Sequence, residues 1–210
     1  PETNSMSSGQ VLTEPYTFEK ARNVVMEMAD AISLELVEKR LVTNQLVLYV
    51  NYDRESLTRP EIAAKYHGEV VVDYYGRPVP KPAHGTSNLS DYSSSSKEII
   101  NSVISLYDRI VNRDMLIRRL NISTNNIVPE SLPSQDEKQE ESQLDLFTDY
   151  DALAKKKRTQ KVEREKERRM QEALINIKHR FGKNAILKGT SYAEGATAKL
   201  RNKQIGGHRE

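Results

Sequence analysis

Two segments of this chain repeat their apolar residues every three or four positions, and segments with strand-like alternation lie beside them. The first repeat spans about 17–40, and the second follows a serine run at 93–96. A period of three to four residues places the apolar side chains on one face of a helix. The sequence therefore predicts two helices that each bury one face. The two stripes are Phe18, Ala21, Val25, Met28, Ile32 and Leu36, and Ile99, Ile100, Val103, Tyr107, Ile110 and Val111.

Four further segments have the composition or the alternation of strands. They are residues 5–12, 46–52, 86–92 and 115–122, and a smaller strand and turn is predicted at 69–76. In chain order the main elements read β-α-β-β-α-β, which lets two helices cover one face of a four-stranded sheet. The predicted fold class is therefore α+β, with the other face of the sheet open. We expect the function of the chain to lie on that open face.

Local signals mark the ends of both predicted helices. Thr17 can cap the start of the first helix, and Lys39 and Arg40 suit the negative end of its dipole. The first helix is therefore expected to extend to Arg40. The serine run at 93–96 can cap the second helix, because a serine hydroxyl accepts a hydrogen bond from a free backbone N–H of the first turn.

The net charge of +2 conceals three blocks of different balance. Residues 1–132 carry 14 Lys and Arg against 17 Asp and Glu, residues 133–151 carry one against seven, and residues 152–210 carry 17 against six. Blocks of charge indicate segments with different roles. We predict a folded body at 1–130, an acidic flexible linker at 131–147, and a basic helix and tail at 148–210.

The basic block predicts one long helix over about 149–181. Its first half is almost entirely charged and could follow the phosphates of a duplex. Its second half has an apolar stripe that requires a cover, either the body of the chain or a partner helix. Gly182 can end the helix, because glycine readily adopts the left-handed conformation found after a helix C-terminus. The stripe consists of Met170, Leu174, Ile177 and Phe181.

Composition argues against several classes of protein. There is no cysteine, which excludes disulfides and thiolate metal sites, and the four histidines are scattered. No apolar run approaches the roughly 18 residues of a membrane-spanning helix, and the start of the chain lacks the pattern of a signal peptide. No nucleophile–base pair, phosphate-binding loop or cluster of metal ligands is visible. We expect a cytoplasmic segment without a cofactor or a catalytic centre of its own.

The predicted last strand carries two adjacent arginines, Arg118 and Arg119. Adjacent side chains of a strand point to opposite faces, so one of them must project from the open side or the rim of the sheet. It either keeps an edge strand soluble or contacts phosphates together with hydroxyls and backbone amides. RNA-recognition modules share this order of elements but stack bases on aromatic residues of central strands. The strands of this chain that we take as equivalent to those central strands have no pair of aromatic residues. They carry Ser5, Met6, Ser7, Thr86, Ser87 and Asn88.

The acidic linker contains one apolar pentapeptide. The stretch before it, residues 129–142, is rich in Pro, Ser, Gln, Asp and Glu, a composition that does not bury enough surface to fold. An extended peptide with a Gln amide and a Leu-Phe pair suits a small apolar pocket on a partner. Alternatively, or in addition, Phe147 packs on the long helix, with Thr148 as its cap and Asp151 completing a capping box. The pentapeptide is Gln143, Leu144, Asp145, Leu146 and Phe147.

This pentapeptide resembles the bacterial sliding-clamp binding motif, whose family pattern is Gln-Leu-x-Leu-Phe. Residues 4–130 resemble the little-finger domain of Y-family translesion DNA polymerases, in the branch of the UmuC-like proteins. Residues 4–8 are similar to the family's opening strand Lys-Ser-Ile-Gly, with Asn4 in place of the lysine. Residues 117–122 are similar to its Ile-Arg-Arg-Ile-Gly-Val strand, with Asn121 in place of the glycine. The tail resembles those of Gram-positive members.

The resemblance implies a non-catalytic part of an error-prone polymerase that acts in DNA repair, damage tolerance and the SOS response. The sheet would grip both backbones of a primer–template duplex without reading its sequence, and the pentapeptide would dock on the sliding clamp. Nothing in the chain matches the catalytic palm, which would hold the Mg²⁺ of the parent polymerase. We therefore expect a carboxyl-terminal fragment that is inactive alone. The implied DNA contacts are Ser5, Ser7, Ser8, Thr86, Ser87, Arg118 and Arg119.

Two other hypotheses remain at this point. The chain could be a protein-interaction adaptor that binds the clamp or another partner without gripping DNA. A stand-alone enzyme is the third possibility, and no arrangement of residues in the sequence supports it. Salt-dependent binding of duplex DNA separates the first two hypotheses, because contacts to phosphates release counterions.

Overall fold

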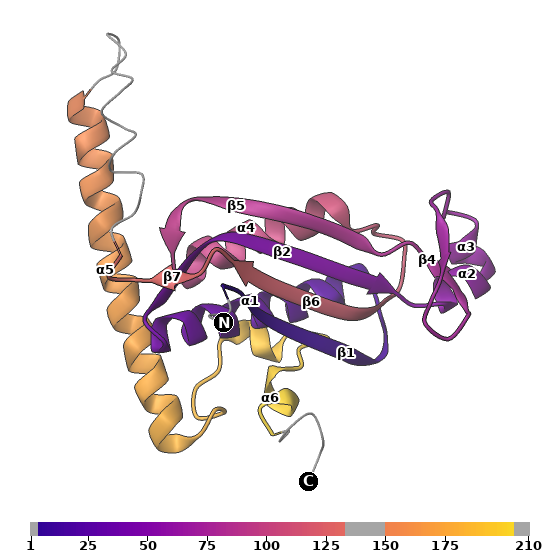
Figure 1. Cartoon of the computed structure of the whole chain (residues 1–210). Helices are drawn as coiled ribbons and strands as arrows, with labels where there is room; N and C mark the ends of the chain where they lie inside the picture. Colours follow the sequence, from indigo (N-terminus) through magenta and orange to yellow (C-terminus); the bar gives the residue numbers. More distant parts are fainter. Residues whose placement is uncertain (1–3, 133–149, 204–210) are drawn as a thin grey trace.

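The computed structural model describes residues 4–132 and 150–203, and the pentapeptide at 143–147 lies outside the described residues (Figure 1). The predicted linker at 131–147 therefore stays a prediction for the most part. The elements in chain order are β1 (Met6–Tyr16), α1 (Phe18–Glu38), β2 (Leu41–Tyr52), α2 (Glu55–Thr58), α3 (Pro60–Ala63), β3 (Val70–Val72), β4 (Pro78–Pro80), β5 (Ala83–Ser93), α4 (Ser96–Ile110), β6 (Ile117–Asn125), β7 (Val128–Pro129), α5 (Tyr150–Phe181), the 3-10 turn η2 (Gly189–Tyr192) and α6 (Ala198–Arg201).

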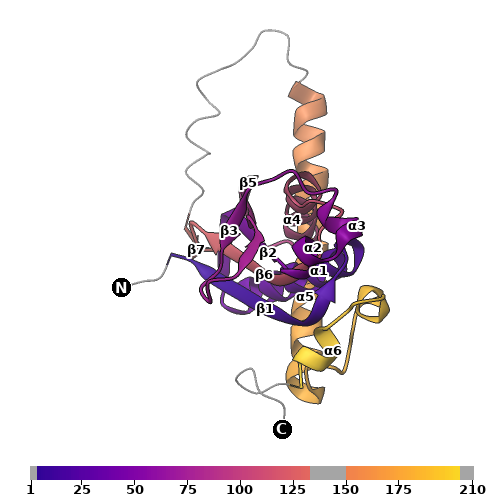
Figure 2. The same cartoon turned by 90° about the vertical axis from the view of Figure 1, so that its right-hand side faces the viewer.

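The main sheet has the strand order β1-β6-β2-β5, and all its neighbours are antiparallel. The two-residue strand β7 adds to the beginning of β2, which the sequence did not predict. Helices α1 and α4 cover one face of this sheet and leave the other face open (Figures 1 and 2). The predicted α+β class, the β-α-β-β-α-β order and the two helices on one face are therefore confirmed.

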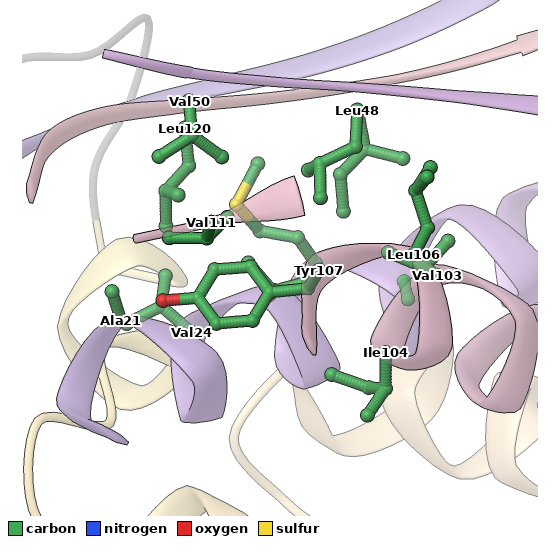
Figure 3. Packing of buried hydrophobic residues seen from close by; sticks show 14 of the residues in the cluster. Ala21, Val24, Leu48, Val50, Val103, Ile104, Leu106, Tyr107, Val111 and Leu120 are labelled. Atoms are coloured by element: carbon green, nitrogen blue, oxygen red, sulfur yellow. The ribbon is translucent and has the colours of Figure 1, made fainter. Parts of the chain in front are cut away.

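The core lies between the sheet and the two helices. Tyr107 of α4 is fully buried and lies among Ala21 and Val24 of α1, with Leu120 and Val50 of the sheet on its other side (Figure 3). Its hydroxyl donates a hydrogen bond to the backbone carbonyl of Phe18, at 2.9 Å. A buried hydroxyl needs such a partner, because leaving it without one costs free energy of desolvation. Tyr107 thereby links α4 to the first turn of α1.

The helix ends follow the sequence signals only in part. The hydroxyl of Ser95 accepts a hydrogen bond from the N–H of Glu98 at 3.2 Å, so the serine cap of α4 is confirmed. Thr17 occupies the N-cap position of α1, but its side chain makes no capping hydrogen bond. Helix α1 ends at Glu38, two residues earlier than expected, because Arg40 adopts a left-handed conformation with φ of 55°.

The long helix α5 is confirmed, but its docking surface is polar. The body of the chain does not cover two members of the predicted apolar stripe, since Met170 is 56% exposed and Phe181 is 72% exposed. The alternative cover, a partner helix, stays a prediction. The buried residue is instead Gln171, whose amide donates to the carbonyl of Ser94 at 3.0 Å and to the hydroxyl of Ser96 at 2.9 Å. Polar groups in the first turn of α4 need partners, and α5 supplies them.

The segment after α5 lies across the outer side of α1 (Figure 1). Gly182, with φ of 91°, ends α5 as predicted. The carboxylate of Glu27, buried in α1, accepts hydrogen bonds from the N–H groups of Thr197 and Ala198 at 2.8 and 3.0 Å. Lys188 lies 2.6 Å from the carboxylate of Asp30 on the same helix. The tail is therefore attached to the helix layer, on the side away from the open face.

The connection from β2 to β5 folds as a small unit at one end of the sheet (Figure 1). It contains the helices α2 and α3 and the antiparallel hairpin β3–β4, in which Val71 pairs with Val79. The predicted small strand and turn near Gly76 are therefore confirmed. None of the helices in the described parts of the chain has the length and apolarity needed to cross a bilayer.

Truncating an aliphatic side chain to alanine should affect the free energy of unfolding differently on the two faces of the sheet. We expect Leu120→Ala to lower the free energy of unfolding by about 2–5 kcal/mol, because Leu120 is fully buried under the helices. The matched control Val11→Ala, on the open face and 63% exposed, should change it by less than about 0.5 kcal/mol. Urea denaturation followed by circular dichroism measures both. Equal losses would contradict the described packing.

Candidate nucleic-acid interface

The open face is built from alternate positions of the four main strands. Leu46, Leu48 and Val50 of β2 point into the core and are fully buried, so the residues between them point the other way. The pairing register extends this alternation to the neighbouring strands. We call the following set the open face: Ser7, Gly9 and Val11 of β1; Arg119, Asn121, Ser123 and Asn125 of β6; Gln45, Val47, Tyr49 and Asn51 of β2; and His84, Thr86 and Asn88 of β5.

Neutral hydrogen-bonding groups dominate this surface. The amide of Asn125 donates to the side-chain oxygen of Gln45 at 3.2 Å, and the amide of Gln45 donates to that of Asn88 at 3.1 Å. One row of amides therefore connects β6, β2 and β5. No Asp or Glu stands among the open-face positions, although the whole chain has 30 acidic residues. Such a surface can donate hydrogen bonds to an anion without repelling it.

The two adjacent arginines have different environments. Arg119 lies between Val11 and Asn51 in the register and is exposed, and its guanidinium has no hydrogen-bond or ion-pair partner among the side chains that the structure describes. Arg118 lies where the register between β2 and β6 shifts. Its guanidinium donates to the carbonyl of Thr13 at 3.2 Å and lies 3.7 Å from the carboxylate of Asp53. Arg118 therefore ties strand ends together, whereas Arg119 is available to a ligand.

Three of the other predicted DNA contacts lie on the open side. Ser7 and Thr86 belong to the open face, and Ser5 is exposed just before β1 begins. Ser8 and Ser87 lie on the opposite side, which corrects their expected position. Ser8 pairs with the buried Ile122, and the hydroxyl of Ser87 hydrogen-bonds that of Ser102 in α4 at 2.8 Å. Successive side chains of a strand point to opposite faces of the sheet, so Ser8 faces the helices although its neighbour Ser7 lies on the open face.

The structure also corrects which strands form the centre of the sheet. The analogy with RNA-recognition modules makes the first and third main strands, β1 and β5, the central ones. In the structure these two strands are the edges of the sheet, and β6 and β2 lie between them. The central strand β2 displays Tyr49, whose ring centroid lies 5.8 Å from that of His84 on β5. Sequence reasoning missed this pair, although the alternation around Leu48 already placed Tyr49 on the open face.

Three aspartates scattered over the body, Asp53, Asp73 and Asp91, each have a partner within the chain. Asp53 accepts a hydrogen bond from the N–H of Glu55 at 2.9 Å, and Asp91 pairs with Arg164 of α5 at 3.1 Å. Asp73 lies in the turn of the β3–β4 hairpin and accepts from the N–H of Tyr75 at 2.9 Å. Within the described parts of the chain, no group of three or more His, Cys, Asp or Glu residues is arranged to hold a metal ion.

The chain is therefore an α+β domain whose sheet has a helix layer on one side and a largely polar face without carboxylates on the other. The sequence matches the impB/mucB/samB family C-terminal domain over residues 3–146, which is more than half of the chain. The chain belongs to this family, the carboxyl-terminal or little-finger domain of Y-family DNA polymerases, and the resemblance seen in the sequence is confirmed. A comparison with curated protein sequences finds no match.

A comparison with solved structures also finds matches. One is a complex of the beta-clamp processivity factor and the little finger domain of PolIV, with 7% identity and a TM-score of 0.39, covering 69% of this chain and 99% of that one. Another is an insertion ternary complex of Dbh DNA polymerase, with 10% identity and a TM-score of 0.36 over 61% of this chain. The chain spans only 31% of the length of the Dbh polymerase.

The different environments of the two arginines predict different effects on stability. We expect Arg118→Ala to lower the free energy of unfolding by about 0.5–1.5 kcal/mol, because it removes the contacts with Thr13 and Asp53. Arg119→Ala should change it by less than about 0.5 kcal/mol, since Arg119 is exposed. Urea titrations of the two variants beside the wild type measure this. The opposite order would mean that Arg119 is the arginine that supports the fold.

Proposed function

We propose that this chain is the DNA-gripping and clamp-tethering part of an error-prone translesion polymerase. The observation that carries the proposal is Arg119, whose side chain has no partner among the described side chains and which lies near one end of the open face, a surface without carboxylates. The amides of Asn51, opposite Arg119, and of Asn121, the next open-face residue on β6, can donate to phosphate oxygens, as can the hydroxyl of Ser7 further along the face. Family membership supports the same assignment.

The chemistry of the open face favours contact with the backbone of a duplex over reading of its bases. A flat sheet presents no helix or ribbon that could enter a major groove. Its donors suit phosphates and sugars, which are the same for every sequence. Binding should therefore be independent of sequence and weakened by salt. A loose grip of this kind also suits a polymerase that has to accept a damaged template.

The pentapeptide at 143–147 supplies the second contact in this proposal. It matches the clamp-binding pattern at every fixed position and follows the body in a stretch rich in polar and acidic residues. Two weak contacts joined by a tether bind more tightly than either alone, because the second event becomes intramolecular. The clamp would thereby raise the local concentration of the sheet at the primer terminus.

We assign phosphoryl transfer to a palm domain of a longer polymerase, which would bind the Mg²⁺ ions. The part described here would need no cofactor of its own, and its scattered aspartates serve turns and ion pairs. A polymerase that acts on chromosomal DNA in bacteria works in the cytoplasm, which is where we expect this chain. The described residues contribute binding and positioning.

The first test measures the DNA grip. In fluorescence anisotropy with a primer–template duplex, Arg119→Ala should weaken binding about tenfold, since a charge-assisted hydrogen bond is worth about 1.5–3 kcal/mol. The slope of log affinity against log salt should fall by about 0.9, because one phosphate contact is lost. The matched control is Lys97→Ala, an exposed cation at the start of α4 in the helix layer, which should bind as the wild type does.

Two outcomes would contradict the DNA grip. If the wild-type chain does not bind the duplex even at low salt, the open face is not a DNA interface. If Lys97→Ala weakens binding as much as Arg119→Ala does, the attraction comes from net charge and not from the open face. Either result would favour the adaptor hypothesis, in which the pentapeptide is the functional part of the chain.

The second test concerns the tether. Leu146→Ala/Phe147→Ala should weaken binding to an immobilised bacterial sliding clamp at least about a hundredfold, because burying each such side chain is worth about 1.5–3 kcal/mol. Binding of duplex DNA should not change. Leu132→Ala, a 55% exposed leucine outside the motif, is the matched control. Surface plasmon resonance measures the clamp binding, and undiminished binding by the double variant would remove the tether from the proposal.

A further inference from the structure

One carboxylate forms several contacts across the turn of the β3–β4 hairpin. Asp73 accepts hydrogen bonds from the backbone N–H groups of Tyr75 and Arg77, both at 2.9 Å, and pairs with the guanidinium of Arg77 at 2.7 Å. The hydrogen bond from Arg77 holds the pKa of Asp73 below its usual value. Gly76 takes the left-handed conformation that the turn requires, with φ of 75°. Contacts within the turn therefore stabilise this conformation.

This turn displays two tyrosines to solvent. Tyr74 is 96% exposed and Tyr75 is 75% exposed, and their rings meet edge to face with centroids 5.4 Å apart. The guanidinium of Arg77 lies 4.8 Å from the centroid of the Tyr75 ring. Large aromatic side chains on an exposed turn indicate a contact with a partner, because their burial is strongly favourable. We call these three residues the hairpin tip.

The position of the hairpin tip relates it to the open face. The hairpin belongs to the connection between β2 and β5, two strands that together carry Tyr49 and His84 on the open face. Figure 2 shows the β3–β4 hairpin on the sheet side of the molecule, whereas α2 and α3 lie toward the helix layer. The hairpin follows the end of β2 and precedes the start of β5, so a duplex that runs along these strands on the open face leads toward it. A DNA strand that continues beyond the end of such a duplex has unpaired bases.

We propose that the hairpin tip stacks on unpaired bases of a DNA strand that runs off the duplex held on the open face. Aromatic rings and arginine planes are the groups that proteins use to bind unpaired bases without reading their sequence. The tip offers both: the ring of Tyr74 is 96% exposed, and the guanidinium of Arg77 lies over the ring of Tyr75, which is 75% exposed. This inference rests on the proposed duplex grip and adds a second, single-stranded part to the DNA that is bound.

The test compares two DNA probes with the complete chain. One is a blunt duplex, and the other is the same duplex with a single-stranded extension that carries 2-aminopurine near the junction. Wild-type protein should bind the extended duplex at least about fivefold more tightly than the blunt one, as expected for one stacked base. Stacking should also quench the fluorescence of 2-aminopurine. The chain has no tryptophan that would interfere with this signal.

Substitutions at the hairpin tip then assign the effect to the tyrosines. Tyr74→Ala/Tyr75→Ala should abolish the preference for the extended duplex and the quenching, and should leave binding of the blunt duplex unchanged. Tyr74→Phe/Tyr75→Phe should keep both effects, because stacking uses the rings and not the hydroxyls. The matched control is Tyr192→Ala, a tyrosine of the tail that is 73% exposed and lies next to α1. It should behave as the wild type does.

The outcomes distinguish this inference from the proposed function. If the blunt duplex binds but the double alanine variant keeps its preference for the extension, the inference is overturned and the duplex grip stands. The hairpin tip, with the exposed Val70 and Val72 beside it, would then be a protein contact. If the blunt duplex does not bind at all, the duplex grip fails, and this inference fails with it.

Discussion

The burial of one face of β2 and β6 under α1 and α4 is the interaction on which the rest of the structure depends. Leu48, Val50, Leu120 and Ile122 are completely removed from water, and this burial fixes which way every neighbouring side chain on both strands points. The open face therefore needs no packing of its own. Its amides and Arg119 can stay available for a ligand because the stability of the sheet comes from the opposite side.

The outer side of the helix layer is occupied by polar contacts. Gln171 satisfies groups at the start of α4, and Glu27 satisfies the first N–H groups of α6. Buried polar groups that bond one another hold α5 and the tail in defined positions, which an apolar stripe alone would not do. The consequence is a division of the molecule, with α5 and the tail on the helix side and the open face and the β3–β4 hairpin on the sheet side (Figure 2).

Neighbouring residues in this chain perform different tasks because of small irregularities in the sheet. Arg118 lies at the shift in register and binds Thr13 and Asp53, whereas Arg119 stays in the regular ladder and its guanidinium has no partner among the described side chains. The hairpin tip is a similar case, since one aspartate orders the turn and leaves the two tyrosines exposed. A loose, sequence-independent grip and a stacking contact would be complementary, because one suits paired and the other unpaired DNA.

The sequence by itself determined the two helices, the four main strands and their order along the chain. Hydrophobic periodicity is a local property, and the tertiary structure here did not override it. The sequence alone also identified the clamp-binding motif at 143–147, which lies outside the described residues. Tertiary structure alone decided that β6 and β2 are central, that Ser8 and Ser87 face the helices, and that α5 docks through Gln171. These features depend on strand pairing and on contacts between residues far apart in the chain, which no local pattern of a single sequence records.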